Sequence, residues 1–159
     1  MILGMTTATF TLVHVILSLI GILSGFVVVF GLLQGKRLNG LTVLFLTTTA
    51  LTSVTGFAFP NSHITPGIIL GILSLVVLAV AIAARYIFHL TGAWLRVYVI
   101  GTVLALYFNV FVLIAQCFQK IPALKALAPT GTEPPFLIAQ LIVMALFIPL
   151  GVLAGKRAR

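Results

Sequence analysis

Charge is scarce in this sequence, and negative charge is almost absent. The 159 residues contain nine Lys and Arg and one acidic residue, so that only 6% are charged, while 62% are apolar. Soluble domains have about 25% charged residues, and a chain with so few cannot cover a water-facing surface. The composition therefore excludes an ordinary soluble enzyme, a disordered chain and a nucleic-acid-binding domain. It predicts a multi-span membrane protein whose surroundings are the lipid bilayer.

Several kinds of catalytic site are excluded by the residues that the sequence lacks. Glu133 is the only carboxylate side chain, so a carboxylate pair, a Ser-His-Asp triad and an acidic Mg²⁺ site cannot form. Cys117 is the only cysteine, which rules out an intramolecular disulfide and a cysteine pair for zinc or an iron–sulfur cluster. Coupled transport typically uses a buried Asp or Glu, and no apolar run contains one. We therefore expect that the protein is not an enzyme.

Five apolar runs are long enough to cross a bilayer as helices, because a hydrocarbon core of about 30 Å needs about 20 helical residues. The runs cover residues 9–33, 41–59, 66–88, 97–118 and 136–154. Short connections between the first four predict antiparallel neighbours. The fourth connection, 119–135, contains four prolines and is expected to form an ordered lid or irregular loop. The predicted fold is an all-α bundle of five transmembrane helices, with residues 1–159 forming a single membrane domain.

The basic residues are divided unevenly between the two ends of these helices. Lys120 and Lys125 lie on one side, and the other seven lie on the opposite side. Because short cytoplasmic loops carry an excess of Lys and Arg, the N-terminus is predicted to lie outside and the C-terminus in the cytoplasm. The predicted location is the inner (plasma) membrane. The seven cytoplasmic residues are Lys36, Arg37, Arg85, Arg96, Lys156, Arg157 and Arg159.

Polar side chains within and between the apolar runs predict a site that faces the outer side. His14 lies about five residues into the first run, Gln116 is near the end of the fourth, and Gln140 is near the start of the fifth. Asn109 shares a helix face with Gln116, and His63 lies in an outer connection. Polar groups at membrane depth are costly and usually face the bundle interior. These five residues are therefore the candidate ligand-binding residues.

Three functions remain open at this point. The first is a non-catalytic membrane subunit or a small-molecule-binding bundle, with a membrane-protein partner or a second copy of the chain. The second is a passive transporter of a small neutral or quinone-like molecule, which would use a pocket between the helices. The third is a haem b- or metal-binding protein in which the imidazoles of His14 and His63 are the ligands.

Overall fold

Five long helices dominate the fold, in a computed structural model that describes residues 2–60 and 63–157. They are α1 (Thr7–Leu33), α2 (Asn39–Gly56), α3 (Pro66–Ile82), α4 (Ala93–Lys120) and α6 (Pro134–Arg157). A π-helical turn, η1 (Ala83–Ile87), continues α3, and a short helix, α5 (Pro122–Leu127), follows α4. The predicted all-α fold class is confirmed. The 119–135 connection is not helical throughout, as expected.

Local signals in the sequence determine where several helices begin. Thr6 caps α1 by accepting a hydrogen bond from the Thr9 amide at 3.2 Å. Thr65 caps α3 in the same way, accepting from the Ile68 amide at 3.3 Å, and Pro66 occupies the first helical position. With η1 counted as the end of α3, the helix ends differ from the predicted runs by up to four residues. At both ends of α4 and α6 the helix continues beyond the apolar run into flanking residues, whereas α2 ends at Gly56, three residues before its run does.

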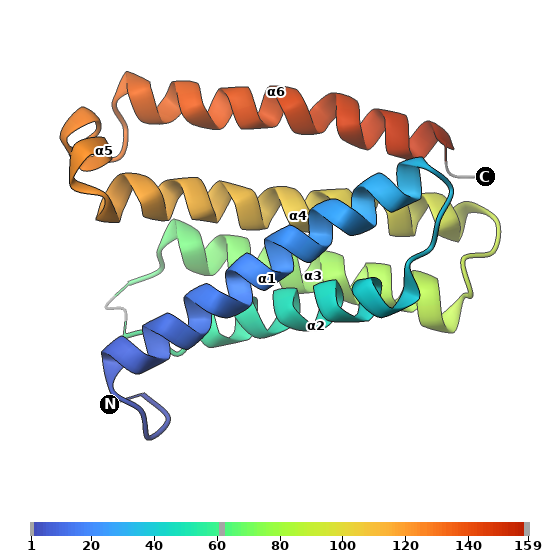
Figure 1. The fold of residues 1–159 in the computed structure, drawn as a ribbon, viewed down its shortest axis with the longest axis horizontal. Coiled ribbons are helices and arrows are strands. Elements are labelled where there is room, and N and C mark those ends of the chain that lie inside the picture. Colours follow the sequence, from blue (N-terminus) through green and yellow to red (C-terminus); the bar gives the residue numbers. More distant parts are fainter. Residues whose placement is uncertain (1, 61–62, 158–159) are drawn as a thin grey trace.

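The long helices lie roughly along one axis, with α4 in contact with α1, α3 and α6, and α2 in contact with α1 and α3. In Figure 1, α1 crosses the others diagonally. The α1–α2 turn, the η1–α4 turn and the end of α6 lie together at one end of the bundle, which we call the basic end (residues 34–38, 83–96 and 155–157). The N-terminus, the α2–α3 connection and α5 lie at the opposite end, which we call the α5 end (residues 2–10, 57–60, 63–65 and 117–135).

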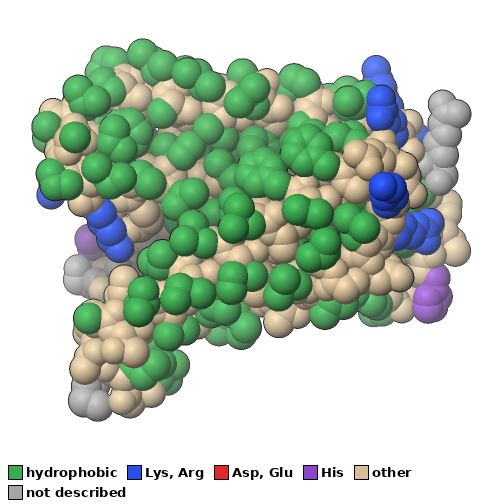
Figure 2. Space-filling model, in the orientation of Figure 1, with side chains coloured by type: hydrophobic (Ala, Val, Ile, Leu, Met, Phe, Trp, Pro, Cys, Tyr) green, Lys and Arg blue, Asp and Glu red, His purple; other side chains and the backbone are tan. Residues whose placement is uncertain are grey.

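Within residues 2–60 and 63–157, four helices are long and apolar enough to cross a membrane: α1, α3 together with η1, α4 and α6. Their outward faces carry many exposed large hydrophobic side chains, which cover the sides of the bundle in Figure 2. Lys and Arg are concentrated toward the basic end in the same view. The helix α2 has 18 residues, and its six threonines and one serine lower its hydropathy. The structure is thus a helical bundle of the membrane type.

Close packing joins α1 to α2 and α4 near the middle of the bundle. Gly25 faces Phe45 and Leu106, and a Cβ at position 25 would lie 2.8 Å from each of these side chains. Gly21 faces two hydroxyl oxygens of α2, which would be 3.2 Å from its Cβ. These two glycines, one turn apart on α1, therefore allow close approach between helices. Beyond this crossing, the N-terminal half of α1 diverges from α4 (Figure 1).

Candidate functional site

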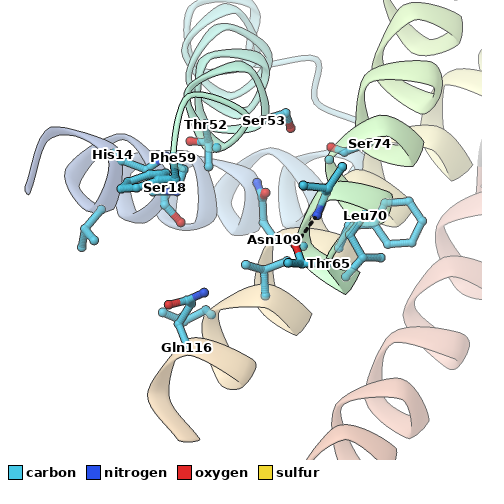
Figure 3. Close-up of a pocket in the computed structure, with 18 of the residues that line it drawn as sticks. His14, Ser18, Thr52, Ser53, Phe59, Thr65, Leu70, Ser74, Asn109 and Gln116 are labelled. Carbon is cyan, nitrogen blue, oxygen red and sulfur yellow. Dashed lines mark hydrogen bonds between the residues drawn. The ribbon is translucent and has the colours of Figure 1, made fainter. Parts of the chain in front are cut away.

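A cavity of about 410 Å³ lies between the helices toward the α5 end of the bundle. Its walls come from the N-terminal half of α1, the C-terminal part of α2, the N-terminal half of α3 and the C-terminal half of α4. Figure 3 shows side chains from all four helices around this space, and Figure 2 shows the surface hollowed at the same end. The volume lies within the range of about 300–1,000 Å³ that is usual for small-molecule sites.

The cavity wall combines a large apolar surface with a set of uncharged polar groups. Aromatic rings of Phe57, Phe59 and Phe108 contribute to the apolar part. None of the described lining residues is acidic, and Lys120, an exposed residue at the end of α4, is the only Lys or Arg among them. The polar lining side chains include His14, Ser18, Thr52, Ser53, Thr65, Ser74, Asn109 and Gln116.

The hydrogen bonding of His14 determines what its ring offers to a ligand. The Nδ1 atom lies 2.7 Å from Thr55 Oγ1. The Thr55 hydroxyl also lies 2.7 Å from the Leu51 carbonyl, and when it donates its hydrogen there it accepts from His14. In that arrangement the hydrogen of the neutral imidazole lies on Nδ1. Its Nε2 atom keeps a lone pair and has no hydrogen-bond partner among the described residues, so it can accept from a ligand.

Ser74 presents a buried donor at the cavity wall. This residue is 3% exposed, and its Oγ atom has no hydrogen-bond partner within the described part of the chain. A buried hydroxyl left in this state costs about 1–3 kcal/mol. Asn109 lines the same cavity (Figure 3). Its Nδ2 atom donates to Thr49 Oγ1 at 3.2 Å, which orients the amide. The Ser74 oxygen is itself closed to solvent, so a molecule with an accepting atom in the cavity gains a hydrogen bond from it once this side chain turns toward the cavity.

The threonines of α2 contribute acceptors to this region rather than donors. Thr48, Thr52 and Thr55 each donate to the carbonyl four residues earlier, at 2.7 Å. This bonding satisfies each hydroxyl hydrogen within its own helix, and the oxygen keeps a lone pair. The bond from His14 to Thr55 is one use of such a lone pair.

The structure brings together three of the five predicted site residues. His14, Asn109 and Gln116 all line the cavity (Figure 3). Gln140, on α6, does not line it; its Nε2 atom donates to a backbone carbonyl of α4 at 3.2 Å. His63 is exposed in the α2–α3 connection and is not among the lining residues either. The expected convergence of all five side chains is therefore not found. Their role in ligand binding stays a prediction.

Sequence reasoning missed the importance of one face of α3. Gly67, Gly71 and Ser74 have the spacing of one helical face, which predicts packing against a neighbour. In the structure, this face lines the cavity, and only Phe57 approaches Gly71 closely, at 3.0 Å from the position of a Cβ. The spacing identifies the face, but it does not show whether a neighbouring helix fills the space in front of it.

The arrangement gives no support to the predicted metal or haem site. Within the described residues, no three His, Cys, Asp or Glu side chains form a group that could hold a metal ion. The cavity wall contains one imidazole, from His14, and one thiol, from Cys117. A bis-histidine haem needs two imidazoles, and His63 does not line this wall.

Comparison of the chain with protein-family models, with curated proteins and with solved structures gave no match. Inference about function therefore depends on the chemistry of the cavity and on the arrangement of the helices.

Proposed function

We propose that this protein is a multi-span membrane protein whose cavity binds a small uncharged molecule with an apolar body and a carbonyl-type hydrogen-bond acceptor, as in a quinone. The observation that carries the proposal is the Ser74 hydroxyl, which is buried, has no partner among the described residues and lies at the wall of a 410 Å³ cavity. A carbonyl oxygen is the complementary group. The aromatic part of the wall suits an apolar ring or tail.

The charge of the cavity wall favours an uncharged ligand. Burying an ionised group without a partner is costly in a low-dielectric environment. The described wall offers no carboxylate to a cation, and its one basic side chain, Lys120, is exposed at the end of α4. The Nε2 atom of His14 adds an acceptor, so the site can also receive a ligand hydroxyl.

Binding accounts for the geometry better than catalysis or passage through the bundle. No carboxylate in the described wall is available to act as an acid or base beside His14. The core of the bundle contains large side chains with less than 2% exposure, among them Phe45, Tyr98 and Leu106. This packing favours a closed site that is reached from the α5 end. It argues against a continuous channel through the bundle. We propose a non-catalytic binding bundle or membrane subunit on these grounds, with association with a membrane partner or a second copy as part of the same proposal.

We propose five spans, with α2 as the fifth. At 1.5 Å per residue, its 18 residues extend about 27 Å, and it packs beside α1 and α3. The hydrogen bonds that its threonine hydroxyls donate within the helix reduce the cost of these side chains in lipid. The excess of Lys and Arg at the basic end supports a cytoplasmic location for that end, in the inner (plasma) membrane, with the N-terminus outside.

Cysteine accessibility tests this topology in a chain with Cys117 replaced by Ala. Single cysteines at Leu3, Lys36 and Ala58 sample the ends of α1 and α2. In intact cells, a membrane-impermeant maleimide should label Leu3→Cys and Ala58→Cys but not Lys36→Cys. Labelling of Lys36→Cys alone would reverse the orientation. Labelling of positions 36 and 58 from the same side would show that α2 does not cross the membrane.

Titration of a short-tailed benzoquinone into the purified protein tests the ligand class, with calorimetry as the readout. The Ser74→Ala variant should bind the quinone about five- to tenfold more weakly, the effect of losing one hydrogen bond. A matched control is Thr102→Val, because Thr102 Oγ1 is also buried and without a partner among the described residues but does not line the cavity. This control should bind as the wild type does.

Three outcomes would refute the proposal. One is the absence of saturable quinone binding to the wild type. Another is equal affinity in the wild type and Ser74→Ala, and the third is an equal loss in Ser74→Ala and Thr102→Val. An analogue that carries a carboxylate in place of the ring carbonyl should bind more weakly, because the described wall has no charged partner for it inside the bundle.

A further inference from the structure

The positive charge at the basic end has no acidic partner within the chain. Glu133 is the only acidic residue, and it lies just before α6 at the α5 end. In Figure 2, blue side chains gather mainly at the basic end. No acidic side chain of this chain therefore neutralises the basic end. The described basic residues of this end are Lys36, Arg37, Arg85, Arg96, Lys156 and Arg157.

Several of these side chains already have partners within the bundle. Arg85 donates to the Tyr98 hydroxyl at 3.2 Å and to the side-chain oxygen of Asn39. Arg157 donates to the Leu33 carbonyl at 2.9 Å. These contacts tie helix ends together and use part of the donor capacity of both guanidinium groups.

Two other basic residues flank a groove between α4 and α6 with a volume of about 290 Å³. Its walls include Ile100 and Val152, which are 47% and 53% exposed. Ile100 lies one turn deeper in α4 than the basic residue at position 96, and Val152 lies one turn deeper in α6 than the one at position 156. The groove thus runs from a charged rim to an apolar interior. Its lining consists of Arg96, Ile100, Gly151, Val152, Gly155 and Lys156.

Arg96 is held at the rim of this groove in a geometry suited to a phosphate. Its Nε atom donates to the Gly155 carbonyl at 3.3 Å, which ties the guanidinium to α6. The two Nη groups have no hydrogen-bond partner among the described residues, and the same is true of the Lys156 amine. A guanidinium fork matches two phosphate oxygens, and a neighbouring ammonium adds a point charge.

We propose that the α4–α6 groove binds an anionic phospholipid. Its phosphodiester lies between Arg96 and Lys156, and an acyl chain lies along Ile100 and Val152. Charge complementarity selects the anionic headgroup, as in other basic pockets between membrane helices. A free phosphate would leave the apolar walls of the groove uncovered, which favours the lipid. This inference goes beyond the proposed function, since it requires neither the quinone-like ligand nor the orientation of the bundle.

Native mass spectrometry of the detergent-solubilised protein tests the proposal. Phosphatidylglycerol is the anionic probe, and phosphatidylcholine with the same acyl chains is the neutral reference. The wild type should retain phosphatidylglycerol in preference, and Arg96→Gln should lower its retention about fivefold, the effect of one basic group near a lipid phosphate. The control Lys125→Gln removes a charge at the α5 end and should leave retention unchanged.

Two further variants separate a built site from general attraction to positive charge. Arg96→Lys keeps the charge but loses the fork, and Gly155→Leu keeps the charge but fills the groove. Both should weaken the preference for phosphatidylglycerol. Equal retention of the two lipids by the wild type overturns the proposal, as does an undiminished preference in either folded variant. Circular dichroism reports whether Gly155→Leu folds. If this variant does not fold, the lipid preference of Arg96→Lys alone tests the proposal.

Discussion

Replacing Gly25 by Ala tests the packing of α1 against the two helices that it crosses. The new Cβ would lie 2.8 Å from side-chain atoms of both Phe45 and Leu106. These two residues are 0% exposed, so neither can move aside without displacing other core side chains. Overpacking of this kind costs about 1–3 kcal/mol, whereas replacing Gly by Ala within a helix stabilises by about 0.5–1 kcal/mol. The free energy of unfolding should therefore fall by about 0–2.5 kcal/mol.

Two other glycines provide matched controls. At Gly40, in the first turn of α2, an added Cβ meets nothing within 4 Å, so Gly40→Ala should show only the helix-forming gain. The difference between Gly40→Ala and Gly25→Ala cancels that gain and isolates an overpacking cost of about 1–3 kcal/mol. At Gly31 the contact would be 2.6 Å, but to the half-buried Leu38, which can rotate. The free energy of unfolding of Gly31→Ala should therefore lie between those of the other two variants.

Equilibrium unfolding in mixed micelles, followed by far-UV circular dichroism and Trp94 fluorescence, measures the free energies. The expected order of stability is Gly40→Ala, then Gly31→Ala, then Gly25→Ala. Equal stability of Gly25→Ala and Gly40→Ala would refute the argument that buried, immobile side chains surround Gly25.

Three further predictions concern single contacts. The Thr130 hydroxyl donates to Glu133 at 2.6 Å and, with backbone hydrogen bonds, lowers the pKa of that carboxyl from 4.5 to about 2. These bonds should therefore stabilise the α5–α6 connection above pH 4.5 and be lost as the pH falls through about 2. An NMR titration should show that midpoint, and Thr130→Ala should raise it; an unchanged midpoint would show that the Thr130 hydroxyl does not lower the pKa. A double-mutant cycle of Asn109→Leu and Thr49→Val should give a coupling of about 0.6 kcal/mol, usual for hydrogen bonds between membrane helices, in the same unfolding assay; zero coupling would mean that this bond contributes nothing. Cys117 lines the cavity, so bound quinone should slow its reaction with a small maleimide, and equal rates with and without quinone would place the ligand elsewhere.

The helices themselves could be predicted, because an apolar run of bilayer length must satisfy its own backbone hydrogen bonds. All five predicted runs correspond to long helices. For α2, hydropathy alone predicts the helix less clearly. Its threonines count as polar by residue type, although their hydroxyls are hydrogen-bonded within the helix. The sequence could suggest this bonding, but only the coordinates show which hydroxyls take part.

The candidate site was only partly predictable. Helical spacing places His14, Asn109 and Gln116 on faces of their own helices, and these three do line one cavity. Gln140 has a comparable signal in the sequence, yet its Nε2 atom binds a carbonyl of α4 away from the cavity. Periodicity defines directions around a single helix axis. It contains no information about which neighbouring helix lies in each direction.

The sequence by itself determined the helical class, the number of long apolar runs and the uneven distribution of basic residues, because each depends on the composition of one segment at a time. The tertiary structure alone decided that α1 crosses close to α4 at Gly25 and that the wall beyond includes a Ser74 hydroxyl without a partner among the described residues. Those features depend on the angles and distances between helices. Such angles and distances result from the packing of many side chains from different segments together, so no single segment encodes them.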